Sequence, residues 1–153
     1  MNTAISLPDL FSAFTNLRVL VIGDVMLDAY VWGRVERISP EAPVPIVTVD
    51  RREMRLGGAG NVLLNVQALG AKAIVCSVIG TDMAGDQLQQ QLLERGMNCD
   101  GLIRSQSRVT TIKERIIAGS QQVVRVDTET NKYITDAERT QLIATAKSLI
   151  PDC

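Results

Sequence analysis

The stretch that decides the fold is Gly57-Gly58-Ala59-Gly60-Asn61, taken together with GDVMLD at residues 23–28 upstream. Glycines allow positive φ and close approach of the backbone to a ligand, and a helix that follows presents free N–H groups. Such a turn binds hydroxyls or anions without a cation. The spacing fits neither a dinucleotide fingerprint nor a Walker A loop. The alternative is a tight strand-to-helix turn with no ligand.

Two carboxylates follow the apolar, β-branched run Arg18–Ile22, which is typical of a buried parallel strand. We expect Asp24 and Asp28 just past the carboxyl end of that strand, where open α/β sheets bind ligands. Asp28 could accept two hydrogen bonds from a sugar diol. The alternative for a lone aspartate is a helix or turn cap.

The periodicity of apolar residues predicts helices at 7–16, 59–69, 82–95 and 135–149, and strands at 18–22, 72–79 and 101–104. This alternation favours an α/β fold with a mainly parallel sheet. The last helix begins with a capping box, Thr135 and Glu138. The side chains expected to face inward from the last three helices are Val62, Leu63, Val66, Leu69, Leu88, Leu92, Leu93, Leu142, Ala146 and Leu149, with Ile143 and Ile150 beside them.

Four further strand segments do not fit the alternation. Residues 30–35 and 44–49 flank a segment with three prolines in six residues, which forbids a helix there. Residues 110–117 and 121–126 form a predicted hairpin around Ala118-Gly119-Ser120. We expect these strands to form a small accessory sheet off the main one.

Basic residues gather in these strands. If the accessory sheet folds over the glycine-rich turn, two or three of them could hold a substrate phosphate, because arginine suits bidentate phosphate contact. On a solvated face they would have no such role. The residues are Arg34, Arg37, Arg51, Arg52, Arg55, Lys113, Arg115 and Arg125.

Composition excludes several classes of function. A net charge of −1 and an aromatic content of 3% argue against nucleic acid as a partner. The sequence has no histidine, which excludes Ser-His-Asp and Cys-His catalysis within this chain. Three widely spaced cysteines fit neither a disulfide framework nor a zinc site, so we expect a reduced, cytoplasmic setting. No apolar run approaches the roughly 18 residues that span a bilayer.

The run GGAGNVLLNVQALGAKAIVCSVIGTDMAG at residues 57–85 resembles the N-terminal signature of the ribokinase (PfkB-type) sugar kinases, and GDVMLD resembles their first-strand motif. A narrower resemblance covers VWGRVERISPEAPVPIV at 31–47, LGGAGN, and TTIKERIIAGSQQVVRVD at 110–127. These segments are similar to the bacterial kinases for D-glycero-β-D-manno-heptose 7-phosphate, which in many bacteria precede an adenylyltransferase domain.

The resemblance implies a ribokinase-like three-layer α/β/α fold with a small β lid, at approximately residues 30–50 and 110–127. It implies transfer of the γ-phosphoryl group of ATP, with Mg²⁺, to the C1 hydroxyl of the heptose, for ADP-heptose and lipopolysaccharide core synthesis. A homodimer through the lid strands is also implied. The matching sugar contacts are Asp28, Gly57, Gly58 and Asn61, with Lys113 and Arg125 as lid contacts to substrate.

The sequence departs from the family pattern in one respect. The Gly-Ala-Gly-Asp-type motif of the catalytic base, the nucleotide loops and the Mg²⁺-associated acidic motif do not occur in it. We therefore expect residues 1–153 to be the N-terminal, sugar-binding half of a kinase domain, inactive and marginally stable or self-associating by itself. The alternatives are a kinase for another sugar, such as ribose or fructose, and a non-catalytic sugar-phosphate-binding or dimerisation module.

Overall fold

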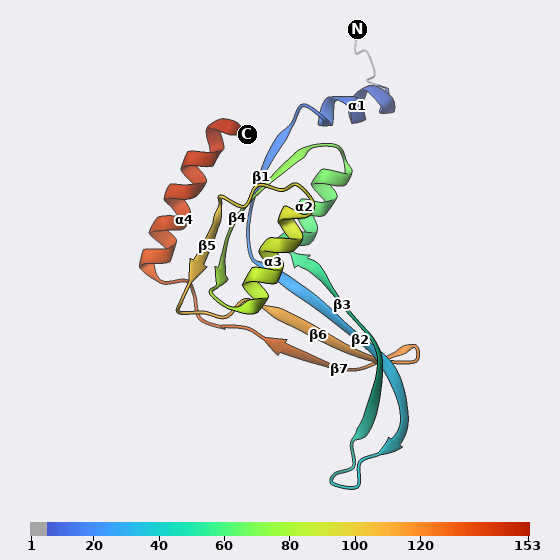
Figure 1. The fold of residues 1–153 in the computed structure, drawn as a ribbon. Coiled ribbons are helices and arrows are strands. Elements are labelled where there is room, and N and C mark those ends of the chain that lie inside the picture. The colour runs from blue at the N-terminus through green and yellow to red at the C-terminus, as the bar shows by residue number, and fades with distance from the viewer. Residues whose placement is uncertain (1–5) are drawn as a thin grey trace.

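The computed structural model describes residues 6–153 and contains two β-sheets and four α-helices in that range (Figure 1). The elements are α1 (Leu7–Phe14), β1 (Arg18–Ile22), β2 (Val25–Ile38), β3 (Pro45–Gly58), α2 (Ala59–Ala68), β4 (Lys72–Gly80), α3 (Met83–Leu93), β5 (Leu102–Ser105), β6 (Ile112–Ala118), β7 (Gln121–Thr128), α4 (Asp136–Leu149) and a short 3-10 turn, η1 (Ile150–Asp152).

The first sheet is parallel, with strand order β1-β4-β5, and helices pack on both of its faces. On one face, Val75 of β4 belongs to a buried cluster with Leu63 of α2 and Leu88 of α3. On the other face, the Cys76 thiol lies 3.9 Å from the backbone carbonyl oxygen of Leu142 in α4. This confirms the predicted α/β alternation and gives three layers.

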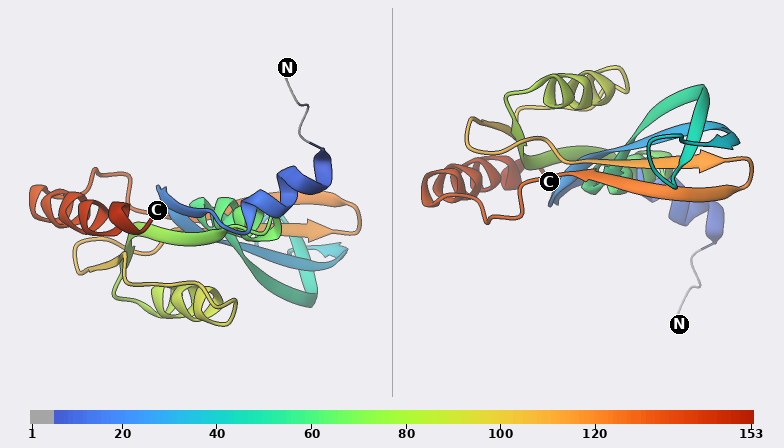
Figure 2. Two further views of the ribbon diagram at one scale, coloured as in Figure 1. Left: turned by 90° about the horizontal axis from the view of Figure 1, so that it is seen from above. Right: turned by 90° about the horizontal axis from the view of Figure 1, so that it is seen from below.

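The second sheet has the order β3-β2-β6-β7, with β2 and β6 parallel and the two outer pairs antiparallel. It extends away from the parallel sheet, and it and α4 lie at opposite ends of the molecule in both views of Figure 2. The predicted accessory sheet is therefore present. The two-residue link at Gly23 and Asp24 carries the chain from the first sheet into the second.

The position expected for Asp28 is wrong, because β2 begins at Val25 and Asp28 lies inside it rather than past the end of a strand. Similarly, β3 runs on to Gly58, nine residues beyond the strand end expected at residue 49. The first part of β2 alternates buried and half-buried residues, as a strand with one covered face should. Apolar residues on both faces, such as Leu27 and Met26, hid this alternation in the sequence.

The covered face of β2 joins the main core: Val25 and Leu27, with Leu56 of β3, belong to the same buried cluster as the α3 leucines. The opposite face carries Asp28 and Tyr30, whose side chains are half-buried. Residues paired directly across neighbouring strands point to the same face of a sheet, so the strand register assigns the other residues of this face. We call it the site face; its members are Met26, Asp28, Tyr30, Trp32, Arg51, Glu53, Arg55, Gly57, Lys113, Arg115, Ile117, Arg125 and Asp127.

Several side chains expected to face inward are exposed instead. Leu63, Leu88 and Leu92 are fully buried, as predicted. The expectation is wrong for Val62, Leu69, Leu93, Ile143 and Ile150, each of which is about half exposed. A periodic apolar pattern indicates which side chains avoid water, but it does not specify which part of the helix surface a neighbouring element covers.

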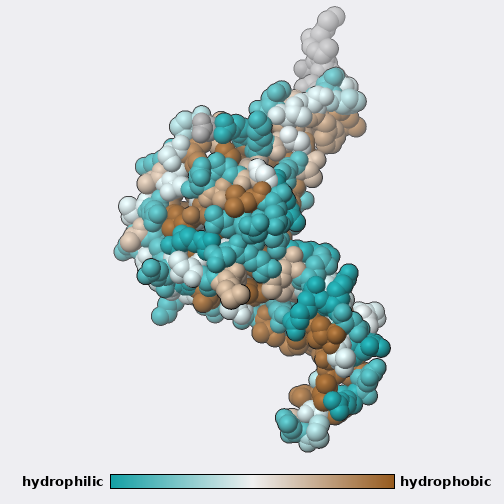
Figure 3. Space-filling view, in the orientation of Figure 1, coloured by the Kyte–Doolittle hydropathy of each residue, from teal (hydrophilic) through white to brown (hydrophobic). Residues whose placement is uncertain are grey.

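Exposed apolar residues also gather on α1 and on the outer part of the second sheet (Figure 3). Helix α1 buries none of its residues. Strands β2, β3 and β7 expose Val35, Ile38, Val49, Val124 and Val126. Apolar residues gathered in this way are typical of surfaces that contact another protein segment.

Candidate functional site

The glycine-rich turn joins the end of β3 to the start of α2 and is fastened to the link between the two sheets. Gly58 has a φ of 56°, in the left-handed region, and a Cβ there would overlap the carbonyl oxygen of Asp24. The same carbonyl accepts a hydrogen bond from the Ala59 N–H at 2.8 Å. The turn therefore has a structural role that only glycine can fill at this position.

The structure brings Asp28 and Gly57 together. Gly57 lies on β3 opposite Met26, two residues along from Arg55, which faces Asp28. A Cβ at Gly57 would overlap the carboxylate of Asp28. The carboxylate thus lies directly over the backbone of the glycine-rich turn, where it can accept hydrogen bonds from a hydroxylated ligand.

Arg115 of β6 is the charged partner of this carboxylate. Its Nη1 donates to Asp28 Oδ1 at 2.5 Å, and both side chains are roughly three-quarters buried, at 24% and 22% exposure. The same Nη1 donates to the Lys113 carbonyl oxygen at 3.3 Å. The hydrogen bond with Asp28 raises the pKa of Arg115. The pair fixes the direction of the carboxylate over Gly57.

Two stacked aromatic rings extend the site face outward from Asp28. The rings of Tyr30 and Trp32 lie 5.4 Å apart with an interplanar angle of 16°. The guanidinium group of Arg51 lies 3.9 Å from the centre of the Trp32 ring, and those of Arg55 and Arg115 lie 5.1 and 5.4 Å from that of Tyr30. This cluster was not predicted from the sequence; the alternation of residues 26, 28, 30 and 32 was the available signal.

Lys113 and Arg125, the two predicted lid contacts, lie on the site face but are engaged with carboxylates. Lys113 Nζ donates to Glu129 at 2.8 Å and to Asp127 at 3.0 Å, and these bonds raise its pKa. Arg125 holds Asp127 with two hydrogen bonds, of 2.9 and 3.0 Å. The bonds from Arg125, and next those from Lys113, lower the pKa of Asp127.

Asn61 is the third residue of α2, in its first turn, and is exposed. Within residues 6–153, no hydrogen bond links its side chain to Asp28 or to the two glycines. The structure therefore brings Asp28, Gly57 and Gly58 together where β2 meets the end of β3, a position we call the crease, and it places Asn61 at the adjacent helix start. Lys113 and Arg125 lie on the two neighbouring strands of the site face.

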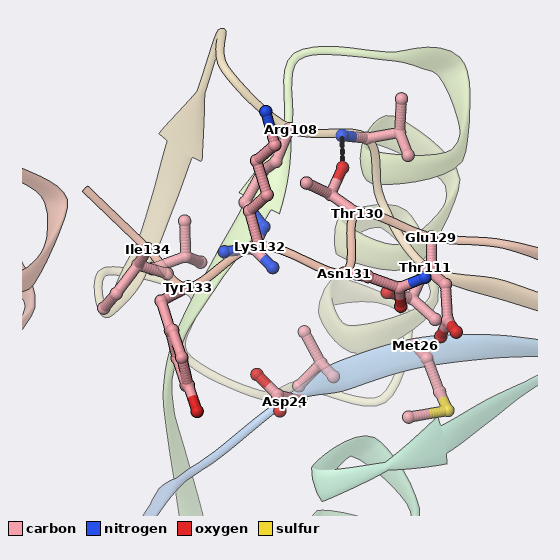
Figure 4. A pocket seen from close by; sticks show the side chains of 13 residues that line it. Asp24, Met26, Arg108, Thr111, Glu129, Thr130, Asn131, Lys132, Tyr133 and Ile134 are labelled. Atoms are coloured by element: carbon pink, nitrogen blue, oxygen red, sulfur yellow. Dashed lines mark hydrogen bonds between the residues drawn. The ribbon is translucent and has the colours of Figure 1, made fainter.

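A hollow of about 400 Å³ lies beside the crease, at the ends of β1 and β4 (Figure 4). Asp24 and Met26 line it on one side, and residues 129–134 line the other. Arg108 and Lys132 bring two positive charges to its rim. The Val109 N–H donates to the Thr130 hydroxyl at 3.2 Å and fastens the two segments that frame the hollow.

The Gly80-x-Asp82-x-x-Gly85 turn fastens the second sheet to the first. Asp82 caps α3 by accepting from the Gly85 N–H at 2.8 Å, and its other oxygen accepts from the Thr110 N–H at 2.8 Å. The Thr110 hydroxyl accepts from the Gly80 N–H at 2.9 Å. Burial opposes ionisation of Asp82, but these hydrogen bonds outweigh it and lower its pKa. These contacts fix the position at which β6 begins, and so the position of Arg115 in that strand.

Comparisons with known proteins place the chain in a family. A family model described as "pfkB family carbohydrate kinase" matches residues 16–150. The bifunctional protein HldE of Citrifermentans bemidjiense is 50% identical over 133 residues, covering 87% of this chain and 27% of that protein. HldE of Desulfatibacillum aliphaticivorans is 46% identical over 142 residues, covering 93% and 29%. The chain thus spans less than a third of the length of these relatives.

Solved structures share the fold at low sequence identity. A sugar kinase structure from Clostridium perfringens superposes with a TM-score of 0.65 at 16% identity, covering 88% of this chain and 40% of that one. A ribokinase from Cryptococcus neoformans, solved with ADP, gives 0.57 at 23% identity, covering 78% and 36%. The architecture is therefore ribokinase-like. No helix within residues 6–153 is long and apolar enough to cross a membrane.

Proposed function

Because this chain belongs to the pfkB family of carbohydrate kinases, we propose that it forms the sugar-binding part of a kinase for D-glycero-β-D-manno-heptose 7-phosphate. The kinase would transfer the γ-phosphoryl group of ATP to the C1 hydroxyl. The similarity to the HldE proteins over most of the chain supports this acceptor. The product would enter ADP-heptose and lipopolysaccharide core synthesis in the cytoplasm.

One observation carries the proposal: the Asp28 carboxylate of β2 lies over Gly57 of the neighbouring strand β3. In the proposed complex, Asp28 accepts hydrogen bonds from two sugar hydroxyls, and Gly57 and Gly58 let the backbone approach the sugar ring. The amide of Asn61 adds a donor and an acceptor at the start of α2. Lys113 and Arg125 contact the substrate from the second sheet, which serves as a lid.

The part played by this chain is to hold the acceptor in position. Phosphoryl transfer depends almost entirely on positioning and on stabilisation of charge. Within residues 6–153 the structure contains no group of three or more His, Cys, Asp or Glu side chains that could hold a metal ion, and we assign none of these residues to Mg²⁺. We propose ATP with Mg²⁺ as the phosphoryl donor of the complete kinase on the ground of family membership alone.

We further propose that the lid strands pair two copies of the protein. The second sheet exposes a group of valines and isoleucines at its outer part, and a partner sheet would remove them from water. The same exposed surface would also make the isolated chain self-associate. Analytical ultracentrifugation of the complete gene product tests this: a monomer at micromolar concentration would contradict it.

The function is tested by ADP formation with the complete gene product. We expect turnover with heptose 7-phosphate, and about a 100-fold or greater loss of kcat/KM in Asp28→Asn, because the amide places a donor NH₂ group where the carboxylate has its second acceptor oxygen. Asp50→Asn serves as the control, since Asp50 is a carboxylate that pairs with Arg34 far out on the same sheet. Preference for ribose or fructose would favour a kinase for another sugar. No turnover, with sugar phosphate still bound, would favour a non-catalytic binding module.

A further inference from the structure

Two arginines lie side by side on neighbouring strands of the site face. Arg115 of β6 and Arg125 of β7 are direct partners in an antiparallel pair. Like charges in this position destabilise a sheet. Each charge is offset by its own carboxylate, Arg115 by Asp28 at 2.5 Å and Arg125 by Asp127 at 2.9 and 3.0 Å. The sheet alone gives no reason to place two arginines opposite one another.

The two arginines lie at a defined distance from the sugar crease. Arg115 pairs with Tyr30 in the register of β2 and β6, one same-face position beyond Asp28. Same-face positions along a strand are separated by about 6.6 Å, since the rise is about 3.3 Å per residue. A phosphate group on a sugar held at Asp28 and Gly57 is therefore within reach of this pair.

The rest of the site face is also rich in guanidinium groups. Arg55 and Arg115 both lie beside the Tyr30 ring, and Arg51 lies over Trp32. The stacked rings position these guanidinium groups, while Arg55 Nε donates to Glu53 and Arg115 Nη1 donates to Asp28. Lys113 is less available than the arginines because it contacts both Asp127 and Glu129.

From this arrangement we propose that Arg115 and Arg125 together bind the phosphate group of a phosphorylated sugar acceptor. The inference rests on the proposed sugar-kinase function and adds the residues that select a phosphorylated substrate. Arg115 exchanges its bond with Asp28 for the phosphate, and Asp28 becomes free to accept from the sugar hydroxyls. Phosphate binding at Arg115 is thus coupled to hydroxyl binding at Asp28, because the two residues form one ion pair in the free protein.

The test compares two ligands by isothermal titration calorimetry with the complete gene product and no nucleotide: the heptose 7-phosphate and the same heptose without phosphate. We expect Arg125→Gln and Arg115→Gln each to weaken binding of the sugar phosphate about 10- to 100-fold, the effect of losing a charge-assisted contact. Arg125→Gln should leave binding of the unphosphorylated sugar unchanged, whereas Arg115→Gln should weaken it less than binding of the sugar phosphate, because Arg115 also orients Asp28. Arg125→Lys should lose less, because it keeps the charge but not the paired donors.

Arg52→Gln is the matched control, because Arg52 lies on the opposite face of the same sheet, in an ion pair with Glu114 at 3.3 Å. It should leave both affinities unchanged. Arg125 is half exposed, so its variant should fold even if that of Arg115 does not. Equal affinity of the unaltered protein for both ligands, or equal loss of both in the arginine variants, would overturn the phosphate site and leave the kinase proposal standing. Failure of both ligands to bind would refute the proposed function itself.

Discussion

The carboxylate of Asp28 lies over the backbone of Gly57, so that no side chain can occupy position 57 without displacing it. The two residues come from neighbouring antiparallel strands, and Arg115 on a third strand fixes the direction of the carboxylate. Three strands of the second sheet thus build one binding crease. Residue 57 must therefore be glycine if the Asp28 carboxylate is to keep this position.

Gly57→Ala should impair ligand binding more than folding. The added methyl group meets the end of a flexible side chain, which can rotate away at a cost of about 1 kcal/mol. The carboxylate would then leave the crease, and affinity for the sugar phosphate should fall at least tenfold. Calorimetric titration and thermal unfolding of the same variant separate the two effects. Unchanged affinity would show that the carboxylate position over Gly57 does not matter for binding.

Gly58→Ala should affect folding first. Gly58 combines a positive φ with a Cβ position that overlaps the backbone oxygen of Asp24, which cannot rotate away. We expect a loss of about 3 kcal/mol or more in the free energy of unfolding. Gly119→Ala is the control, because Gly119 has a φ of 60° with no atom within 4 Å of the added methyl group, and should lose only about 1–2 kcal/mol. Urea unfolding measures both, and equal losses would contradict the overlap at Gly58.

Acid should weaken the attachment of α4 through Glu138. Its carboxylate accepts from the Ser105 hydroxyl, then from the Thr135 N–H, and these bonds lower its pKa to about 2 from an ordinary 4.5. A lowered folded-state pKa contributes stability that is complete above about pH 4.5 and is lost as the pH falls toward 2. Urea midpoints between pH 2 and 6 should therefore fall more steeply in the unaltered protein than in Glu138→Gln. Ser105→Ala should also reduce this acid dependence; parallel curves for all three proteins would refute it.

Neighbouring residues of α2 should differ sharply in their contribution to stability. Leu63 is fully buried in the core, whereas Val62 is 47% exposed. Leu63→Ala should lower the free energy of unfolding by about 2–5 kcal/mol, because it removes buried methyl groups and leaves a cavity. Val62→Ala should change it by no more than about 0.5 kcal/mol. Urea unfolding of both variants tests this; a large loss at Val62 would show that another segment covers this side of α2.

Local rules were enough to locate the helices that pack on the first sheet. The capping box at Thr135 and Glu138 is present in the structure, and the strand Arg18–Ile22 has the bounds expected of it. Such features depend on residues a few positions apart, so composition and periodicity reveal them. The strand carrying Asp28 was misplaced because both of its faces are apolar near Met26, and only the sheet register shows which face is covered.

By itself, the sequence determined the α/β alternation and the second sheet. It also identified the glycine-rich turn, an aspartate and a group of arginines as candidate members of one site. It could not pair Arg115 with Asp28, 87 residues away, or place Arg115 opposite Arg125. Those relations depend on strand order and register, which arise from long-range backbone hydrogen bonding and from the burial of one face of the sheet. A shift of register by one residue would turn every one of these side chains to the opposite face. The tertiary structure alone therefore decided which of the charged residues share a site.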